Sequence, residues 1–157
     1  SRGLGDVYKR QGFNLIPNLT AVENVELPLI YRGVSRSVRQ ELSREALKKV
    51  GLEHRMDHKP SEMSGGQQQR VAIARAIAQA PPVILADEPT GNLDSNSTKE
   101  IMDILKGLHN EGRTVILITH DNDIAAQAKR VIKIKDGKVE SDSGQIVPVE
   151  ELQTAGA

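Results

Sequence analysis

The chain has 157 residues, which is enough for one domain with a hydrophobic core. It carries 21 basic and 21 acidic side chains, so its formal net charge is zero and its composition does not favour a nucleic-acid binder. It contains no cysteine, which excludes a disulfide framework and a thiolate metal site.

The first predicted element is a helix that begins at about residue 21. Thr20 and Glu23 have the spacing of a capping box, in which each side chain accepts a hydrogen bond from the other residue's backbone N–H. Pro28 is expected to end this helix or to bend it, because proline has no amide hydrogen to donate within a helix.

Residues 35–52 predict an amphipathic second helix. Gly51 stands where a helix C-terminal glycine belongs. Apolar residues recur within this segment at helical spacing, namely Val38, Leu42, Leu47 and Val50.

A third helix is predicted to begin after Ser64, which forms a second capping box with Gln67. Pro81 and Pro82 are expected to terminate it. Because residues 20–80 are almost wholly helical by these criteria, we expect them to form a helical subdomain.

Two apolar runs predict buried parallel strands, at residues 83–87 and 114–119. The helix expected between them, within residues 95–112, would turn apolar side chains inward, namely Ile101, Ile104, Leu105 and Leu108. A short helix at residues 123–128 and a further strand follow. This alternation predicts an α/β fold with a doubly wound parallel sheet, whose ligands gather at the carboxyl ends of the strands.

The segment 130–142 alternates apolar and polar residues around Asp136 and Gly137, which is the strongest short signal for a β-hairpin. From residue 143 to residue 157 the sequence has no strong period, and we expect a loosely attached C-terminal tail.

Asp87 ends the first predicted strand, and Glu88 directly follows it. A first carboxylate there can hold Mg²⁺, and the next can accept a proton from an attacking water. Two ordinary acids at a strand exit are the alternative. The apolar run before the pair and the Pro-Thr after it favour the functional interpretation.

Ser64, Gly65 and Gly66 precede a capped helix whose free N–H groups and dipole attract anions. Glycine lets a phosphate approach the backbone closely, so the stretch is a candidate phosphate site. The alternative interpretation is a flexible turn with an ordinary cap. His120 follows the second strand, where it can donate a hydrogen bond to a γ-phosphate. We interpret the other histidines as ordinary surface residues, namely His54, His58 and His109.

Taken in order, these stretches resemble the ATP-binding cassette ATPase family over about residues 11–142. "MSGGQ" resembles its signature motif, "VILADE" its Walker B strand, "GNLD" its D-loop and "ITHD" its switch histidine, and Gln11 resembles the glutamine of its Q-loop. "FNLIPNLTAVENVELPLIYRG" together with "DEPTGNLD" is most similar to the lipoprotein-release and macrolide-export subfamily, with the cell-division cassettes as near relatives.

The resemblance implies a P-loop NTPase-like parallel sheet with an inserted helical subdomain, and a head-to-tail homodimer that holds two ATP molecules at its interface. Ser64, Gly65, Gly66 and Gln67 would then contact the γ-phosphate bound by the partner. Asp94 would cross the dimer interface.

The resemblance also assigns the remaining site residues. Asp87 would organise Mg²⁺, Glu88 would polarise the attacking water, and His120 would sense the γ-phosphate. Gln11 would contact Mg²⁺ and the water and would relay their state to an integral membrane permease subunit.

One family motif has no counterpart in the sequence, because no G-x-x-x-x-G-K-[ST] P-loop occurs and the only Gly-Lys pair is Gly137-Lys138. We therefore expect a cassette domain that lacks its N-terminal third and is incomplete at its N-terminus. We also expect residues 1–10 to be a junction or non-native segment, and the 157-residue chain to bind ATP poorly and to be inactive by itself.

For the complete protein, the resemblance implies an ATPase subunit that couples ATP binding and hydrolysis to a permease. No apolar run approaches the roughly 20 residues that span a bilayer, so we expect a cytoplasmic chain. The resemblance implies that it is peripheral on the inner face of the membrane, and the balanced charge predicts no nucleic-acid partner. The alternatives are a cell-division cassette that acts without transport, a soluble DNA-repair or chromosome ATPase, and a non-catalytic fragment. The second usually has long coiled-coil or zinc insertions, which the sequence lacks.

Overall fold

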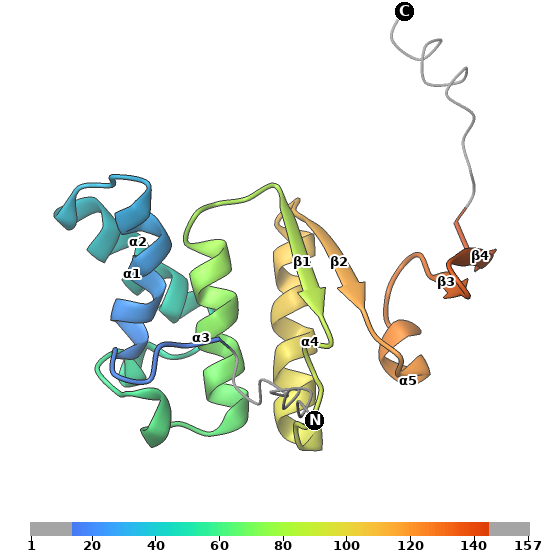
Figure 1. Cartoon of the computed structure of the whole chain (residues 1–157), viewed down its shortest axis with the longest axis horizontal. Helices are drawn as coiled ribbons and strands as arrows, with labels where there is room; N and C mark the ends of the chain where they lie inside the picture. The colour runs from blue at the N-terminus through green and yellow to red at the C-terminus, as the bar shows by residue number, and fades with distance from the viewer. Residues whose placement is uncertain (1–13, 145–157) are drawn as a thin grey trace, which may run out of the picture.

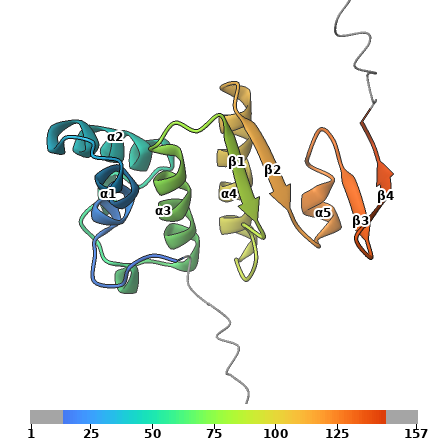
Figure 2. The same cartoon turned by 45° about the horizontal axis from the view of Figure 1, so that its top comes forward.

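The computed structural model describes residues 14–144. Three helices lie together at one end, a β-hairpin lies at the other end, and a strand–helix–strand unit lies between them (Figures 1 and 2). Gln11 and the segment 1–10 lie outside the described residues, as does the tail beyond residue 144.

Residues 21–77 form a helical lobe, as the capping and periodicity signals predict. Its elements are α1 (Ala21–Tyr31), α2 (Arg36–Lys49), the 3₁₀ helices η1 (Glu53–Arg55) and η2 (Pro60–Glu62), and α3 (Gly65–Ile77). The three α-helices contact one another pairwise. Together with α4 they enclose a core built largely from aliphatic side chains, among them Val25, Leu29, Leu47, Leu52, Val71 and Ile101.

Helix α1 begins at the predicted capping box. The Thr20 hydroxyl accepts from the Glu23 N–H at 3.3 Å, and the Glu23 carboxylate accepts from the Thr20 N–H at 2.8 Å. Of the two alternatives for Pro28, that it ends the helix is wrong, because the helix continues to Tyr31. Burial of Leu29, which is 2% exposed, stabilises the last turn and outweighs the one hydrogen bond that Pro28 cannot donate.

Helix α2 buries only the second half of its predicted apolar stripe. Leu47 and Val50 are 0% and 2% exposed, whereas Val38 and Leu42 are 47% and 39% exposed. The helix stops where predicted, since Gly51 adopts a φ of +72°, a conformation that favours glycine.

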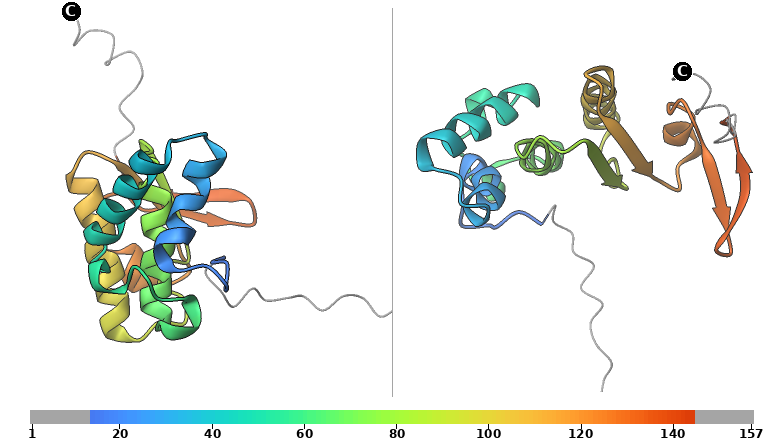
Figure 3. Two further views of the ribbon diagram at one scale, coloured as in Figure 1. Left: turned by 90° about the vertical axis from the view of Figure 1, so that its left-hand side faces the viewer. Right: turned by 90° about the horizontal axis from the view of Figure 1, so that it is seen from above.

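The strand–helix–strand unit consists of β1 (Val83–Asp87), α4 (Ser95–Asn110) and β2 (Thr114–Ile118). The two strands pair in parallel, with Val83 opposite Thr114 and Asp87 opposite Ile118. Helix α4 lies along one side of the strands (Figure 3) and turns its most apolar face inward, as predicted. A parallel β–α–β unit agrees with the predicted α/β class.

The predicted full burial of the strands is wrong for the described residues. Ile84 is buried, but Leu85 is 65% exposed and both Ile116 and Ile118 are nearly half exposed. Buried and exposed residues alternate because α4 covers one face of the pair, and nothing among residues 14–144 covers the other face to the same extent.

After the short helix α5 (Asn122–Ala125), the chain forms the predicted hairpin from β3 (Ile132–Lys135) and β4 (Lys138–Asp142). Its turn residues have positive φ, as a type I′ turn requires. Strand β3 pairs with β4 in a separate sheet and does not extend the β1–β2 pair, which differs from the predicted continuous doubly wound sheet.

A bidentate ion pair closes the hairpin on itself. The Arg130 guanidinium donates to both oxygens of Asp142, at 2.9 and 2.6 Å. These bonds lower the pKa of Asp142 to about 2. The hydroxyl of Ser143 also accepts from the Val131 N–H at 2.8 Å, so the first and last residues of the hairpin are joined at its open end.

No helix among residues 14–144 has the length and apolar character required to cross a membrane.

The difference between the two halves of α2 can be measured. Leu47→Ala should lower the free energy of unfolding by about 2–5 kcal/mol, because it leaves a cavity in the core. Leu42→Ala, the same change on an exposed position of the same helix, should lower it by less than about 1 kcal/mol. Urea unfolding followed by circular dichroism compares them, and equal losses would contradict the core described above.

Candidate functional site

The polar residues that follow β1 and β2 meet at one edge of the parallel pair. Glu88 comes directly after β1, and Thr119 and His120 come directly after β2. The register sets Asp87 opposite Ile118, and the Glu88 N–H donates to the Ile118 carbonyl at 2.8 Å. The strand ends therefore place these side chains next to one another, as the sequence predicts for a doubly wound unit.

Glu88 is held by three donors from the residues after β2. The His120 N–H donates to Glu88 Oε1 at 2.8 Å, and His120 Nδ1 lies 2.7 Å from the same oxygen. The Thr119 hydroxyl donates to Glu88 Oε2 at 3.2 Å. Thr119 was not predicted as a site residue, although a hydroxyl beside a candidate histidine is a signal that could have found it.

The Glu88–His120 contact is a solvent-open ion pair. The hydrogen bond from His120 lowers the pKa of Glu88, and the bond to Glu88 raises the pKa of His120. The two side chains are 38% and 90% exposed, so water screens their attraction. The pair stabilises the fold only between these pKa values: the effect is lost as pH falls through that of Glu88 or rises through that of His120.

Asp87 is exposed at the end of β1. Among the described residues, no group of three or more histidine or carboxylate side chains gathers as a metal site. Mg²⁺ commonly takes one or two carboxylates and completes its shell with waters and substrate phosphates, so a single exposed Asp87 fits such an ion.

The start of α3 has the predicted capping box. The Ser64 hydroxyl accepts from the Gln67 N–H at 3.2 Å, and the Gln67 amide oxygen accepts from the Ser64 N–H at 3.0 Å. The N–H groups of Gly65 and Gly66 lie in the first helical turn, where no intrahelical acceptor reaches them. The Gln67 side chain serves the cap in this conformation.

Asp94 caps α4 and lies beside the start of α3. Its Oδ1 accepts from the Ser97 N–H at 2.9 Å and its Oδ2 accepts from the Ser97 hydroxyl at 2.8 Å, and these bonds lower the pKa of Asp94. Ser97 in turn touches Gly66, since a Cβ built on that glycine would lie 2.5 Å from the Ser97 hydroxyl oxygen. Ser97 was not predicted, because only the packing of α3 against α4 reveals it.

The structure thus gathers the predicted residues into two groups. Asp87, Glu88 and His120 lie at the ends of the strands, and the Ser64–Gln67 stretch lies with Asp94 at the starts of α3 and α4. Gln11 is outside the described residues.

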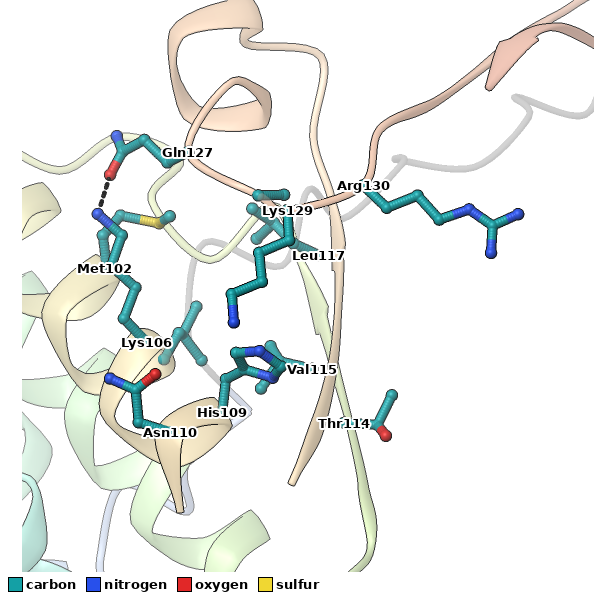
Figure 4. A pocket seen from close by; sticks show the side chains of 12 residues that line it. Met102, Lys106, His109, Asn110, Thr114, Val115, Leu117, Gln127, Lys129 and Arg130 are labelled. Atoms are coloured by element: carbon teal, nitrogen blue, oxygen red, sulfur yellow. Dashed lines mark hydrogen bonds between the residues drawn. The ribbon is translucent and has the colours of Figure 1, made fainter. Parts of the chain in front are cut away.

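A hollow of about 460 Å³ lies elsewhere, between α4, β2 and residues 127–130 (Figure 4). Lys106 and His109 line it, and Lys106 donates to Gln127 at 2.8 Å. None of the predicted site residues contributes to its walls, so we do not assign it to the candidate site.

Comparisons with known proteins agree on one family. The family model described as "ABC transporter" matches residues 3–91. The chain is 56% identical over 141 residues to "Macrolide export ATP-binding/permease protein MacB 2" of Aeromonas hydrophila subsp. hydrophila, which covers 90% of this chain and 22% of that protein. It is 55% identical to the MacB protein of Hyphomonas neptunium, over 89% of this chain and 21% of that protein. The chain spans about a fifth of the length of these relatives.

Two solved structures are similar in fold and sequence. One is the dimeric structure of MJ0796, a bacterial ABC transporter cassette, with 52% identity and a TM-score of 0.72 over 83% of this chain and 59% of that chain. The other is a dimeric post-hydrolysis state of the same cassette bound to ADP and Pi, with 51% identity and a TM-score of 0.71 over 85% and 60%. They support the predicted α/β fold.

The ion pair predicts a change in the titration of His120. Glu88→Gln removes the negative charge but keeps the side-chain size, so the pKa of His120 should fall toward its ordinary value. Asp103→Asn, at an exposed position of α4, is the control and should leave it unchanged. Titration of the histidine ring resonances by NMR measures both, and an equal His120 pKa in the two variants would show that Glu88 does not hold the ring.

Proposed function

The chain belongs to the ABC transporter family, and from that premise we propose that it is an ATP-binding part of a transporter that couples ATP hydrolysis to a membrane permease. The observation that carries this proposal is the placement of Glu88 at the end of β1 within hydrogen-bonding distance of His120 after β2. A carboxylate and an imidazole held together there can act on a water and on a phosphate.

In this proposal Glu88 accepts the proton of the water that attacks the γ-phosphate, and His120 donates a hydrogen bond to that phosphate. Bound Mg²⁺ would supply charge neutralisation, held on the protein side by Asp87 and, as the family resemblance implies, by Gln11. Glu88 Oε1 already accepts two hydrogen bonds and Oε2 accepts one, so Oε2 keeps a lone pair for a substrate water. His120 is 90% exposed, so its ring has room to reach the phosphate.

We also propose that the chain works as a homodimer, with Ser64, Gly65 and Gly66 and the Asp94 loop facing the nucleotide of the partner. The similar cassette was solved as a dimer, which supports this arrangement. Phosphate oxygens suit the uncapped N–H groups at the start of α3. The 157 residues contain no lysine P-loop, so in this proposal a P-loop outside these residues binds the triphosphate.

The permease-facing surface is proposed to lie on the helical lobe. The relatives are named as ATP-binding/permease proteins for macrolide export, so an exporter of the macrolide or lipoprotein-release type is the transporter class we favour. Apolar side chains are exposed on the lobe and on the segment that leads into it, namely Ile16, Ile30, Tyr31 and Val38. Such exposure fits a surface that contacts another protein. The chain would then lie on the cytoplasmic face of the membrane.

The catalytic proposal is tested in an ATPase that carries this sequence together with a lysine P-loop. Glu88→Gln should lower phosphate release at least about 100-fold, because it removes the proton acceptor, while ATP still binds. The ATP-bound dimer should then accumulate in size-exclusion chromatography. Glu140→Gln, the same change on exposed β4, should hydrolyse ATP normally, and normal turnover by Glu88→Gln would remove that residue from catalysis.

The permease proposal is tested by crosslinking, which the absence of native cysteine simplifies. Single cysteines at Ile16, Ile30 and Tyr31 should crosslink to a candidate permease in membranes. A cysteine at Val139, which is equally apolar and 65% exposed but lies on the hairpin, should not. If no lobe position reacts, the lobe is not the coupling surface.

A further inference from the structure

The first turns of α3 and α4 are in unusually close contact at Gly66. A Cβ on this residue would lie 2.5 Å from the hydroxyl oxygen of Ser97 and 2.7 Å from its Cβ, closer than real side chains approach. The serine could rotate its hydroxyl away, but its Cβ is fixed by the backbone of α4. Packing against Ser97 therefore requires glycine at residue 66, whether or not a phosphate approaches.

Ser97 also binds the Asp94 carboxylate. Its N–H and its hydroxyl each donate to a different oxygen of the Asp94 carboxylate, at 2.9 and 2.8 Å. One residue thus contacts the glycine stretch on one side and fixes the D-loop carboxylate on the other. Because the Ser64–Gln67 capping box fixes the start of α3 independently, each helix start is ordered on its own and Ser97 joins the two.

We propose that Ser97 is a positioning residue that sets the spacing between Gly66 and Asp94, so that both reach the partner's nucleotide as one unit. This inference rests on the proposed function for the role of the two groups, although the contact itself does not. If Ser97 were only part of helix packing, its loss would change stability and leave the dimer unaffected. If it positions the two groups, loss of its hydroxyl should weaken the ATP-bound dimer.

The contact is tested first on the 157-residue chain, without nucleotide. Ser97→Ala should shift the amide NMR resonances of Gly65 and Gly66 as well as that of Asp94. Ser95→Ala, which removes a hydroxyl from the same helix start, should leave the two glycines unshifted. Unchanged glycine resonances in Ser97→Ala would overturn the proposal.

A paired substitution tests the close approach itself. Gly66→Ala should lower the melting temperature, because the added methyl meets the Ser97 Cβ. Ser97→Gly removes that Cβ, so Gly66→Ala should cost less stability in the Ser97→Gly background than in the unsubstituted chain. An equal cost in the two backgrounds would show that the two residues do not meet.

The positioning role is tested in an ATPase that carries this sequence with a lysine P-loop. Ser97→Ala should weaken ATP-dependent dimerisation and lower turnover about tenfold, the effect of one hydrogen bond to a charged group. ATP binding by the monomer should stay unchanged, and Ser97→Thr, which keeps the hydroxyl, should restore dimerisation. Ser37→Ala on α2 is the control.

The outcomes separate this inference from the proposed function. Normal dimerisation by Ser97→Ala, with shifted glycine resonances, would reduce Ser97 to a packing residue and overturn the positioning role. If the unsubstituted ATPase neither dimerises with ATP nor hydrolyses it, the proposed function fails. The positioning role then fails with it, while the two measurements on the 157-residue chain still decide the contact.

Discussion

The parallel register of β1 and β2 is the constraint on which the candidate site depends. The ladder extends one bond beyond each end of the strands, from Thr114 to the Pro82 carbonyl and from Glu88 to the Ile118 carbonyl. A slip of one residue would turn every side chain of one strand to the opposite face and would separate Glu88 from His120. The packing of α4 on one face of the strands, and of α4 against the helical lobe, therefore also fixes the geometry at their ends.

The same capping motif begins two helices in this protein whose surroundings differ. Thr20 with Glu23 and Ser64 with Gln67 form capping boxes of nearly the same dimensions. The first caps the N-terminus of a helix in the lobe, and nothing in its geometry distinguishes it from the second. What distinguishes Ser64 is its surroundings, since two glycines follow it and the start of α4 lies against it. Functional meaning here comes from tertiary contacts added to an ordinary cap.

The features predictable from the sequence are those that depend on neighbouring residues. The two capping boxes, the glycine at residue 51 and the turn at Asp136 all follow from local backbone chemistry, and all are present. The exposure of Leu85 and the continuation of α1 past Pro28 depend on what packs there, which periodicity cannot reveal. Asp87, Glu88 and His120 were predicted to gather because each lies at the end of a predicted strand, whereas Ser97 became visible only in three dimensions.

Glu88 adopts a φ of +45°. This conformation costs free energy for a residue that has a side chain, whereas glycine adopts it without that cost. In this conformation the carboxylate reaches the donors of Thr119 and His120. Replacement by glycine would relieve the strain, but it would also remove the carboxylate and the three hydrogen bonds that it accepts. Because these two effects on stability oppose each other, a folding assay is a poor detector of the loss of the proposed catalytic base.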